Sequence, residues 1–219
     1  MAISGEPMLP VVRVAELPSE ELAERWLVEQ LWCARSVGVI GGAPKCAKTW
    51  LGLDMALSVA TGTPCLGKYT VPEPGPVLVY LAEDALPAVR ERVEGMARHR
   101  GLDLDEVEIQ VITAPVLRLD HDRDRTRLWE TVRRLRPRLL VLDPLVRLHG
   151  IDENHAGDVA ELLGYFRTLQ RELSLSVLLV HHTRKNAGTV LPPVKDYAGR
   201  VISTPSATRT CISSERRST

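Results

Sequence analysis

The stretch "GGAPKCAKTW", residues 41–50, matches most of the phosphate-binding loop pattern G-x-x-x-x-G-K-[ST]. A buried strand ("SVGVIGG") is predicted before it and a helix ("KTWLGLDMALSVATG") after it, as such a loop requires. In this arrangement the backbone N–H groups face the phosphates of a nucleotide. Lys48 would then bridge the β- and γ-phosphates, and the Thr49 hydroxyl would hold Mg²⁺. The candidate nucleotide-binding residues are Gly42, Ala43, Pro44, Lys45, Cys46, Ala47, Lys48, Thr49 and Trp50.

One position of the loop departs from the pattern, because Ala47 stands where the pattern has glycine. Glycine permits closer backbone approach than alanine, so a methyl group here crowds the phosphate or strains the turn. We therefore expect reduced rather than absent nucleotide binding. The alternative is a chance strand–turn–helix segment that happens to contain a lysine.

Strands and helices alternate along most of the chain. Further helices are predicted over 18–31, 86–100, 122–136 and 158–173, and further strands in "GPVLVYLAED", "EVEIQVI", "PRLLVLDPL" and "SLSVLLVHH". This alternation predicts an α/β fold with a mainly parallel sheet and helices on both faces. Apolar runs such as "LLVL" are typical of strands covered on both sides.

Polar residues follow the predicted strands, at the sheet edge where ligands bind in this fold class. Glu83 is a candidate base for activating water, and Asp143 is a candidate Mg²⁺ residue. His182 ends another strand and is a candidate contact for the γ-phosphate. Each has a structural alternative: an acid after a strand also caps the next helix, which suits Asp84 better, and "DP" also forms a turn.

The totals exclude some classes of protein. The 219 residues fit one domain, and their formal net charge of zero means that any DNA contact depends on a local patch. No apolar run is long enough to predict a membrane span, and the N-terminus does not resemble a secretory signal. The four cysteines have no metal-ligand spacing, so we expect reduced thiols in a cytoplasmic protein.

Together, "APKCAKTWLGLDMALSVATG", "VLVYLAED", "LLVLDPL" and "VLLVHHTRK" resemble the RepA-like branch of the RecA/DnaB ATPases. The resemblance covers about residues 25–187 and implies a RecA-like P-loop core that hydrolyses ATP with Mg²⁺, often as a hexameric ring on DNA. It implies that Lys48 and Thr49 contact phosphate and magnesium, that Glu83 is the general base and that Asp143 is the Walker B acid. It also implies that His182 senses the γ-phosphate.

In such rings, the loops after the Walker B strand and after the sensor strand face the central channel. Here these loops follow residues 143 and 182, in "VRLHGIDENHAGD" and "TRKNAGTVLPPVK". The resemblance thus makes Arg147, His149, Arg184 and Lys185 candidates for contact with DNA phosphates. Ordinary solvated loop charge is the alternative.

The C-terminal segment does not continue the family pattern, which there reads approximately D-L-H-A-F/W-G-D-S-N-L-Y-L-R-R. We can, however, join the third base of each codon for "RVISTPSATRTCISSERR" to the first two bases of the next codon. The shifted codons then permit R-D-L-H-A-F-G-D-S-N-L-Y-L-L-R. We infer that the reading frame slips between about 187 and 200, and that the core lacks its last strands. A genuine divergent tail without clear strands or helices is the alternative.

These observations divide the chain into an N-terminal lead-in (1–25), an ATPase core (26–187) and a loop with a non-family tail (188–219). The leading interpretation is a Mg²⁺-dependent ATPase of the RepA-like helicase type, whose partners are ATP and DNA. One alternative is a nucleotide-binding module without useful turnover, which the alanine in the loop and the aberrant tail favour. Another is a small-molecule P-loop kinase, although no arginine-rich lid or acceptor-binding signature is visible.

Overall fold

The computed structural model describes residues 11–17, 25–150, 156–182 and 200–204. The helices are α1 (Lys48–Thr61), α2 (Leu86–His99), α3 (Asp122–Leu135) and α4 (Ala156–Leu173), with 3₁₀ turns η1 (Val14–Glu16), η2 (Leu104–Glu106) and η3 (Leu145–Arg147). The strands are β1 (Trp26–Val28), β2 (Trp32–Cys33), β3 (Val37–Gly42), β4 (Val77–Leu81), β5 (Ile109–Val111), β6 (Leu139–Asp143), β7 (Ser176–His182) and β8 (Arg200–Thr204). These elements confirm the alternating pattern predicted from residue 36 to residue 182.

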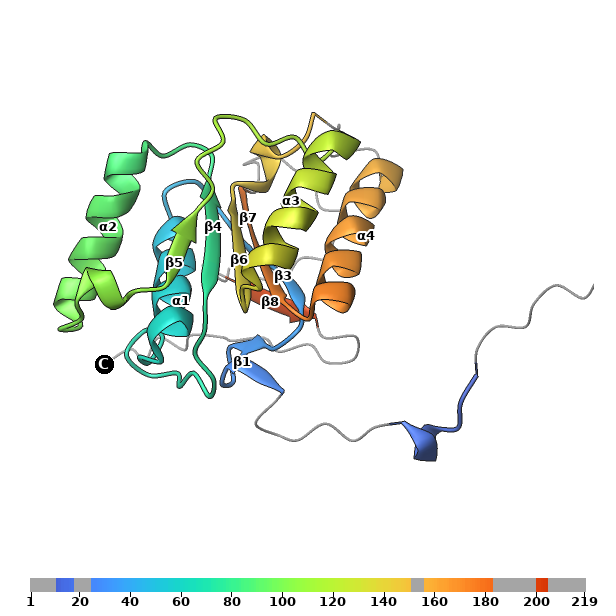
Figure 1. The fold of residues 1–219 in the computed structure, drawn as a ribbon, viewed down its shortest axis with the longest axis horizontal. Coiled ribbons are helices and arrows are strands. Elements are labelled where there is room, and N and C mark those ends of the chain that lie inside the picture. Colours follow the sequence, from blue (N-terminus) through green and yellow to red (C-terminus); the bar gives the residue numbers. More distant parts are fainter. Residues whose placement is uncertain (1–10, 18–24, 151–155, 183–199, 205–219) are drawn as a thin grey trace, which may run out of the picture.

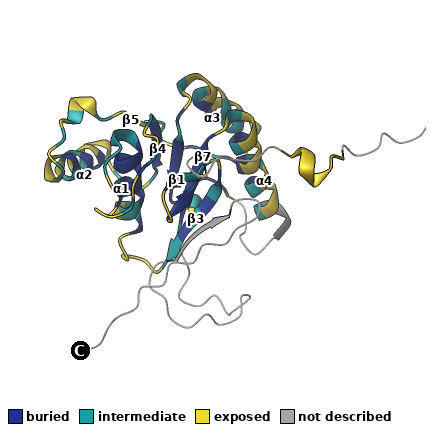
Figure 2. Ribbon diagram, turned by 90° about the horizontal axis from the view of Figure 1, so that it is seen from below, coloured by how far each residue is buried: buried dark blue, intermediate teal, exposed yellow. Residues whose placement is uncertain are grey.

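The central sheet has the strand order β5-β4-β6-β7-β3-β8, in which the first five strands are parallel. Strands β4, β6 and β7 are covered on both sides, with α1 and α2 on one face and α3 and α4 on the other (Figures 1 and 2). Alternate residues of each strand face opposite helices: in β6, Val141 packs with α1 and Leu140 with α3 and α4. The expected α/β sheet with helices on both faces is confirmed.

The N-terminal end of the domain differs from the sequence prediction. Trp26–Val28 forms β1, an antiparallel partner of β2, where a helix over 18–31 was predicted. The rest of that predicted helix up to residue 24 lies outside the described residues. Leu27, Val28 and Trp32 are all buried against α1, so tertiary burial overrides the local helical pattern here.

A second difference lies in the tail, where no strand was predicted. Arg200–Thr204 forms β8, which pairs antiparallel with β3 in the register Val37↔Thr204 to Gly41↔Arg200. This strand has no clear alternation of apolar and polar residues, so the local pattern does not predict it. The residues that follow, 205–219, lie outside the description.

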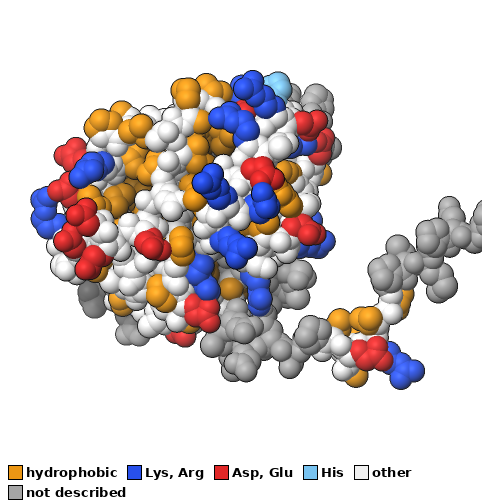
Figure 3. Space-filling view, in the orientation of Figure 1, with side chains coloured by type: hydrophobic (Ala, Val, Ile, Leu, Met, Phe, Trp, Pro, Cys, Tyr) orange, Lys and Arg blue, Asp and Glu red, His pale blue; other side chains and the backbone are white. Residues whose placement is uncertain are grey.

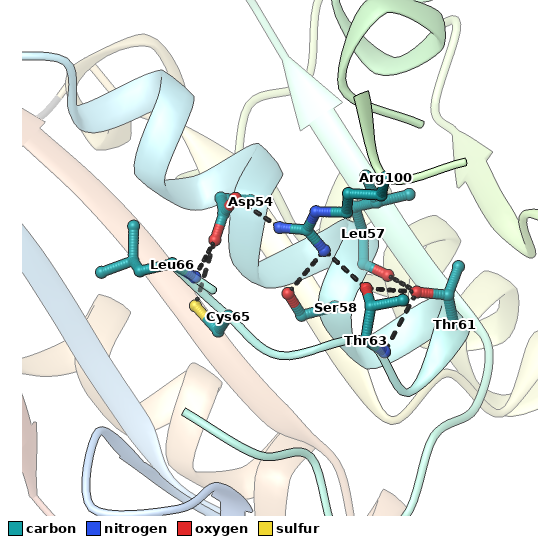
Figure 4. Close-up of polar contacts among 8 residues, drawn as sticks. All are labelled: Asp54, Leu57, Ser58, Thr61, Thr63, Cys65, Leu66 and Arg100. Atoms are coloured by element: carbon teal, nitrogen blue, oxygen red, sulfur yellow. Dashed lines mark hydrogen bonds and ion pairs between the residues drawn. The ribbon is translucent and has the colours of Figure 1, made fainter. Parts of the chain in front are cut away.

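A polar cluster fastens α1 to the end of α2 (Figure 4). The Arg100 guanidinium donates hydrogen bonds to the hydroxyls of Ser58 (2.9 Å) and Thr63 (2.6 Å), and it pairs with the Asp54 carboxylate. Asp54 also accepts a hydrogen bond of 2.7 Å from the backbone N–H of Leu66. Because α1 begins at Lys48, this cluster also holds the helix that carries the phosphate loop.

Candidate functional site

The loop between β3 and α1 has the conformation of a phosphate cradle. Lys45 and Ala47 both adopt left-handed backbone angles, with φ of 63° and 60°. A Cβ on Gly42 would lie 2.8 Å from the Cys46 sulfur, so a larger residue there would require the Cys46 side chain to move. The resulting loop ends directly at the N-terminus of α1, where unpaired backbone N–H groups attract anions.

Ala47 therefore perturbs the loop through backbone strain. Its φ of 60° and ψ of 25° lie in the region that glycine adopts freely and L-residues adopt at a cost of about 1–2 kcal/mol. The loop nevertheless forms with alanine present, and Lys48 follows as the first residue of α1. The sequence allowed two costs for Ala47, crowding of the phosphate or strain of the turn. The left-handed backbone angles show that strain is present.

Lys48 is the buried cation of the loop, with 5% of its surface exposed. Its Nζ donates hydrogen bonds to the carbonyl oxygens of Gly42 (3.0 Å) and Ala43 (2.7 Å). The Cys46 sulfur lies 3.6 Å from the same Nζ. The loop carbonyls therefore hold the ammonium inside the cradle, where it can meet phosphate oxygens.

One pocket of about 380 Å³ brings the strand-end residues to the phosphate loop. It lies where β4 and β6 end and α1 begins, which is the ligand-binding edge of an open parallel sheet. Its lining consists of Lys45, Cys46, Ala47, Lys48, Thr49, Trp50, Glu83, Asp84, Arg92, Asp143 and Pro144. Residues far apart in the sequence and expected to act together thus share one cavity.

The carboxylates of this pocket differ in their surroundings. Asp143 is buried with 5% of its surface exposed, at the end of β6. Glu83 is half exposed and pairs with Arg147 of η3 over 2.8 Å. Asp84 pairs with Arg92 of α2, whose guanidinium also lies 5.6 Å from the Trp50 ring centroid. Sequence reasoning missed both arginine partners, because neither belongs to a motif.

The sensor candidate is placed by its backbone alone. His182 is the register partner of Gly42 in the β3–β7 pair, and His181 is the partner of Gly41. The end of β7 therefore runs beside the start of the phosphate loop, as a γ-phosphate contact requires. The side chain of His182 lies outside the description.

The candidate DNA-contacting residues are only partly accessible. Arg147 is 62% exposed but forms the ion pair with Glu83, and His149 is 7% exposed, so His149 presents little surface to a partner. The backbone after it is fastened, because Gly150 donates a 2.9 Å hydrogen bond to Asp120. The Arg118 side chain, helped by this bond, holds the pKa of the Asp120 carboxyl well below its usual range. Arg184 and Lys185 lie outside the described residues.

The donor set fits Mg²⁺ held in part by a nucleotide. The Thr49 side chain offers a hydroxyl and Asp143 a buried carboxylate on the same pocket as Lys48. Among the described residues no three His, Cys, Asp or Glu side chains gather as a metal cage. Magnesium usually takes one or two protein oxygens together with substrate phosphates and water, so these two donors suit it.

A parallel sheet with a P-loop between β3 and α1, and with acids at neighbouring strand ends, defines a P-loop ATPase of RecA-like fold. The comparison with protein families agrees: the AAA_25 family, described as AAA domain, matches residues 5–188. The chain belongs to this family.

A solved structure shares the fold. The crystal structure of the RadB recombinase aligns with a TM-score of 0.50 at 21% sequence identity. The match covers 71% of this chain and 66% of that one, just under two thirds of its length. A likeness at this identity extends to the fold alone. No helix within the described residues is long and apolar enough to cross a membrane.

Proposed function

We propose that this chain binds ATP with Mg²⁺ and hydrolyses it, and that it does so as a DNA-acting ATPase of the RepA-like helicase type. The observation that carries the proposal is the single pocket that joins Lys48 and Thr49 of the loop to Glu83 and Asp143 of two separate strands. These are the groups that phosphoryl transfer to water requires: a cation, a magnesium ligand, a base and a second acid.

The roles follow from the environment of each side chain. Lys48 holds the β- and γ-phosphates from inside the loop. Thr49 and Asp143 would hold Mg²⁺, which would supply positive charge against the phosphate oxygens. Glu83 takes a proton from a water molecule as that water attacks the γ-phosphorus in line. The bond from the γ-phosphorus to the bridging oxygen breaks, and ADP leaves with that oxygen.

The ion pair of Glu83 has a consequence for this mechanism. A carboxylate oxygen that accepts a hydrogen bond of 2.8 Å from the Arg147 guanidinium is engaged in that contact and is less available to a water molecule. Arg147 belongs to the turn directly after β6, in the segment proposed to meet DNA. In our proposal, a DNA phosphate that attracts Arg147 frees Glu83 and raises the hydrolysis rate.

The DNA contacts and the ring are the finer parts of the proposal. The loop after residue 143 supports it through Arg147, which is exposed at the same edge as the nucleotide pocket. The loop after residue 182 carries Arg184 and Lys185 in the sequence. A hexamer is expected from the resemblance, and sedimentation of the chain with and without Mg²⁺-ATP tests it.

The test is phosphate release by the full 219-residue chain from Mg²⁺-ATP, with and without single-stranded DNA. We expect hydrolysis that DNA stimulates, and loss of that hydrolysis in Lys48→Ala. The Lys68→Ala variant is the matched control, because Lys68 is exposed and lies outside the nucleotide pocket.

Other outcomes separate the rival functions. ATP binding without hydrolysis, in the presence or absence of DNA, contradicts the proposal and indicates a nucleotide-binding module. Transfer of the labelled γ-phosphate to a small acceptor rather than to water indicates a kinase. Equal hydrolysis by the wild type and Lys48→Ala assigns the activity to another site or protein.

We also propose that residues 26–187 form the ATPase core and that residues 188–219 are a loop and a tail outside the family pattern, of which Arg200–Thr204 adds a strand to the edge of the sheet. The family match ends at residue 188, which supports this boundary. Sequencing the gene from codon 180 onward tests the proposed change of reading frame. A one-base change that restores D-L-H-A-F-G-D-S-N-L-Y-L supports it, and a shifted frame without that string contradicts it.

A further inference from the structure

The sheet edge opposite the nucleotide pocket carries a concentration of arginines. This edge is the one where the parallel strands begin: Arg35 lies two residues before β3, and Arg138 directly precedes β6. Figure 3 shows Lys and Arg side chains gathered over α3 and toward the lower edge of the molecule. We call the following set the amino-end patch: Arg35, Arg133, Arg134, Arg136 and Arg138.

The patch is hollowed rather than flat. A pocket of about 260 Å³ is lined by Arg35, Arg136 and Arg138 together with Ser174 and Ser176. A second hollow of about 780 Å³ continues along the last turns of α3 and includes Arg133 and Arg134. Arg136 lines both hollows, so the two adjoin at this residue, and we call them together the track.

Ion pairs neutralise only some of the arginines in the patch, which therefore remains positive. Arg133 pairs with Glu130 over 2.6 Å, and Arg138 pairs with Glu73 over 2.8 Å. Within the described residues, Arg134 and Arg136 have no ion pair. Arg134 and Arg136 thus give the patch two positive charges without an ion-pair partner among the described residues, in a chain whose formal net charge is zero.

A structural role accounts for only part of this charge. Arg133 and Arg134 stand in the last turn of α3, where cations offset the helix dipole. Arg35 and Arg136 lie outside any helix and adopt left-handed angles, with φ of 47° and 48°. Glycine or asparagine fits such positions at lower cost, so a long cation in each is a strained choice.

Guanidinium groups along a track suit a ligand with repeated phosphates. Each arginine presents a planar fork of donors that matches phosphate oxygens in pairs. A protein partner needs apolar anchors at the centre of its interface. Among the described residues, the exposed large apolar side chains are Val11, Val12, Val14, Leu17, Trp50, Leu66, Leu86, Val116 and Val146, none of which lines either hollow.

We propose that the amino-end patch binds the phosphate backbone of a nucleic acid, at a site separate from the nucleotide pocket. This inference rests on the proposed function as a DNA-acting ATPase, and it adds a second contact surface to the loops of the opposite edge. A single strand of nucleic acid would then contact the domain at two places: the loops beside the nucleotide pocket and the amino-end patch.

The experiment measures the anisotropy of a labelled single-stranded oligonucleotide bound to the full chain without nucleotide, over a salt series. The test variant is Arg134→Ala/Arg136→Gly, in which glycine fits the left-handed angle and protects the fold. We expect weaker binding, and a slope of log K against log salt that is smaller by roughly 0.7 for each lost contact. The matched control is Arg90→Ala/Arg98→Ala, which removes two exposed arginines of α2.

The control is expected to retain the wild-type slope, and unfolding midpoints confirm that both variants fold. Equal affinity and slope for the test variant and the wild type overturn the patch and leave the proposed function standing. A wild type that binds no oligonucleotide overturns both. If the test variant loses binding to poly-glutamate but not to the oligonucleotide, the partner is an acidic protein and the proposal is wrong.

Discussion

The two edges of the parallel sheet use charge in opposite ways. At the carboxyl-end edge, acids from β6 and the β4–α2 segment meet lysines of the phosphate loop in one pocket. At the amino-end edge, arginines dominate: Arg100 is saturated by Asp54 and two hydroxyls, whereas Arg134 and Arg136 face outward. The first edge combines acids and lysines in one pocket. The second holds one partly buried arginine that stabilises the fold, apart from arginines that are exposed.

The difference shows that an arginine's role follows from its partners rather than from its type. Arg100 has three neutral or acidic partners and 14% of its side chain exposed, so removing it leaves a carboxylate half-satisfied in the protein. Removing an exposed arginine leaves no carboxylate without a partner inside the protein. Substitutions at the two edges should therefore separate activity from stability.

The largest effect is expected at the carboxyl-end edge, in Glu83→Gln. Loss of a positioned general base lowers hydrolysis by about 10²- to 10⁴-fold. The free energy of unfolding should change by less than about 0.5 kcal/mol, because the side chain is half exposed. Phosphate release and chemical denaturation measure the two quantities. The control is Glu91→Gln on α2; equal rates for both variants would remove Glu83 from the mechanism.

The second effect lies in the partly buried cluster of the amino-end side, in Arg100→Ala. The Asp54 carboxylate loses its cation, and we expect the free energy of unfolding to fall by about 3 kcal/mol. Arg98→Ala, whose side chain is 76% exposed, should cost less than about 0.5 kcal/mol. Urea denaturation measures the free energy of unfolding of both variants. A similarly small decrease in the two variants would contradict the stabilising role of the Arg100 cluster.

A smaller effect is expected in the phosphate loop, in Ala47→Gly. Glycine removes the left-handed strain at φ 60°, so the protein should gain about 1 kcal/mol and bind ATP more tightly. Ala60→Gly, one residue before the end of α1, should instead lose up to about 1 kcal/mol. Thermal unfolding with and without ATP compares the two variants. A loss of stability in Ala47→Gly would show that the alanine is not strained.

The smallest effect is expected from Arg147→Ala, which opens the ion pair of the candidate base. Exposed pairs contribute at most about 1 kcal/mol, so hydrolysis without DNA should rise by roughly two- to fivefold. Stimulation by DNA should shrink by the same factor. Arg127→Ala, which breaks the exposed pair with Asp124, is the control and should change neither rate. An unchanged ratio of stimulated to basal rate in Arg147→Ala contradicts the coupling.

The sequence predicted the carboxyl-end edge far better than the amino-end edge. The loop pattern and the acids after two apolar runs are local signals, and the parallel sheet brings their positions together by a general rule. Arg35 lies about a hundred residues before Arg136 and Arg138 in the sequence, and no motif joins the three. They meet because β3 and β6 begin at the same edge of one sheet.

The remaining errors have a similar cause. The helical period over 18–31 is real, but Trp26–Val28 is buried as a strand because long-range packing outweighs local pattern. The strand at Arg200–Thr204 depends on the free edge of β3, which only the fold reveals. The Glu83–Arg147 pair likewise joins two strand ends that the sequence separates by more than sixty positions.

The central claim is that the pocket at the carboxyl-end edge is an ATP site built around Lys48. Isothermal titration calorimetry of the full chain with ATP, in the presence and absence of Mg²⁺, tests it most directly. Our account predicts one ATP bound per chain, weaker binding without Mg²⁺, and an affinity at least about a hundredfold lower in folded Lys48→Ala. Undetectable binding by the wild type, or equal affinity in Lys48→Ala, would contradict it.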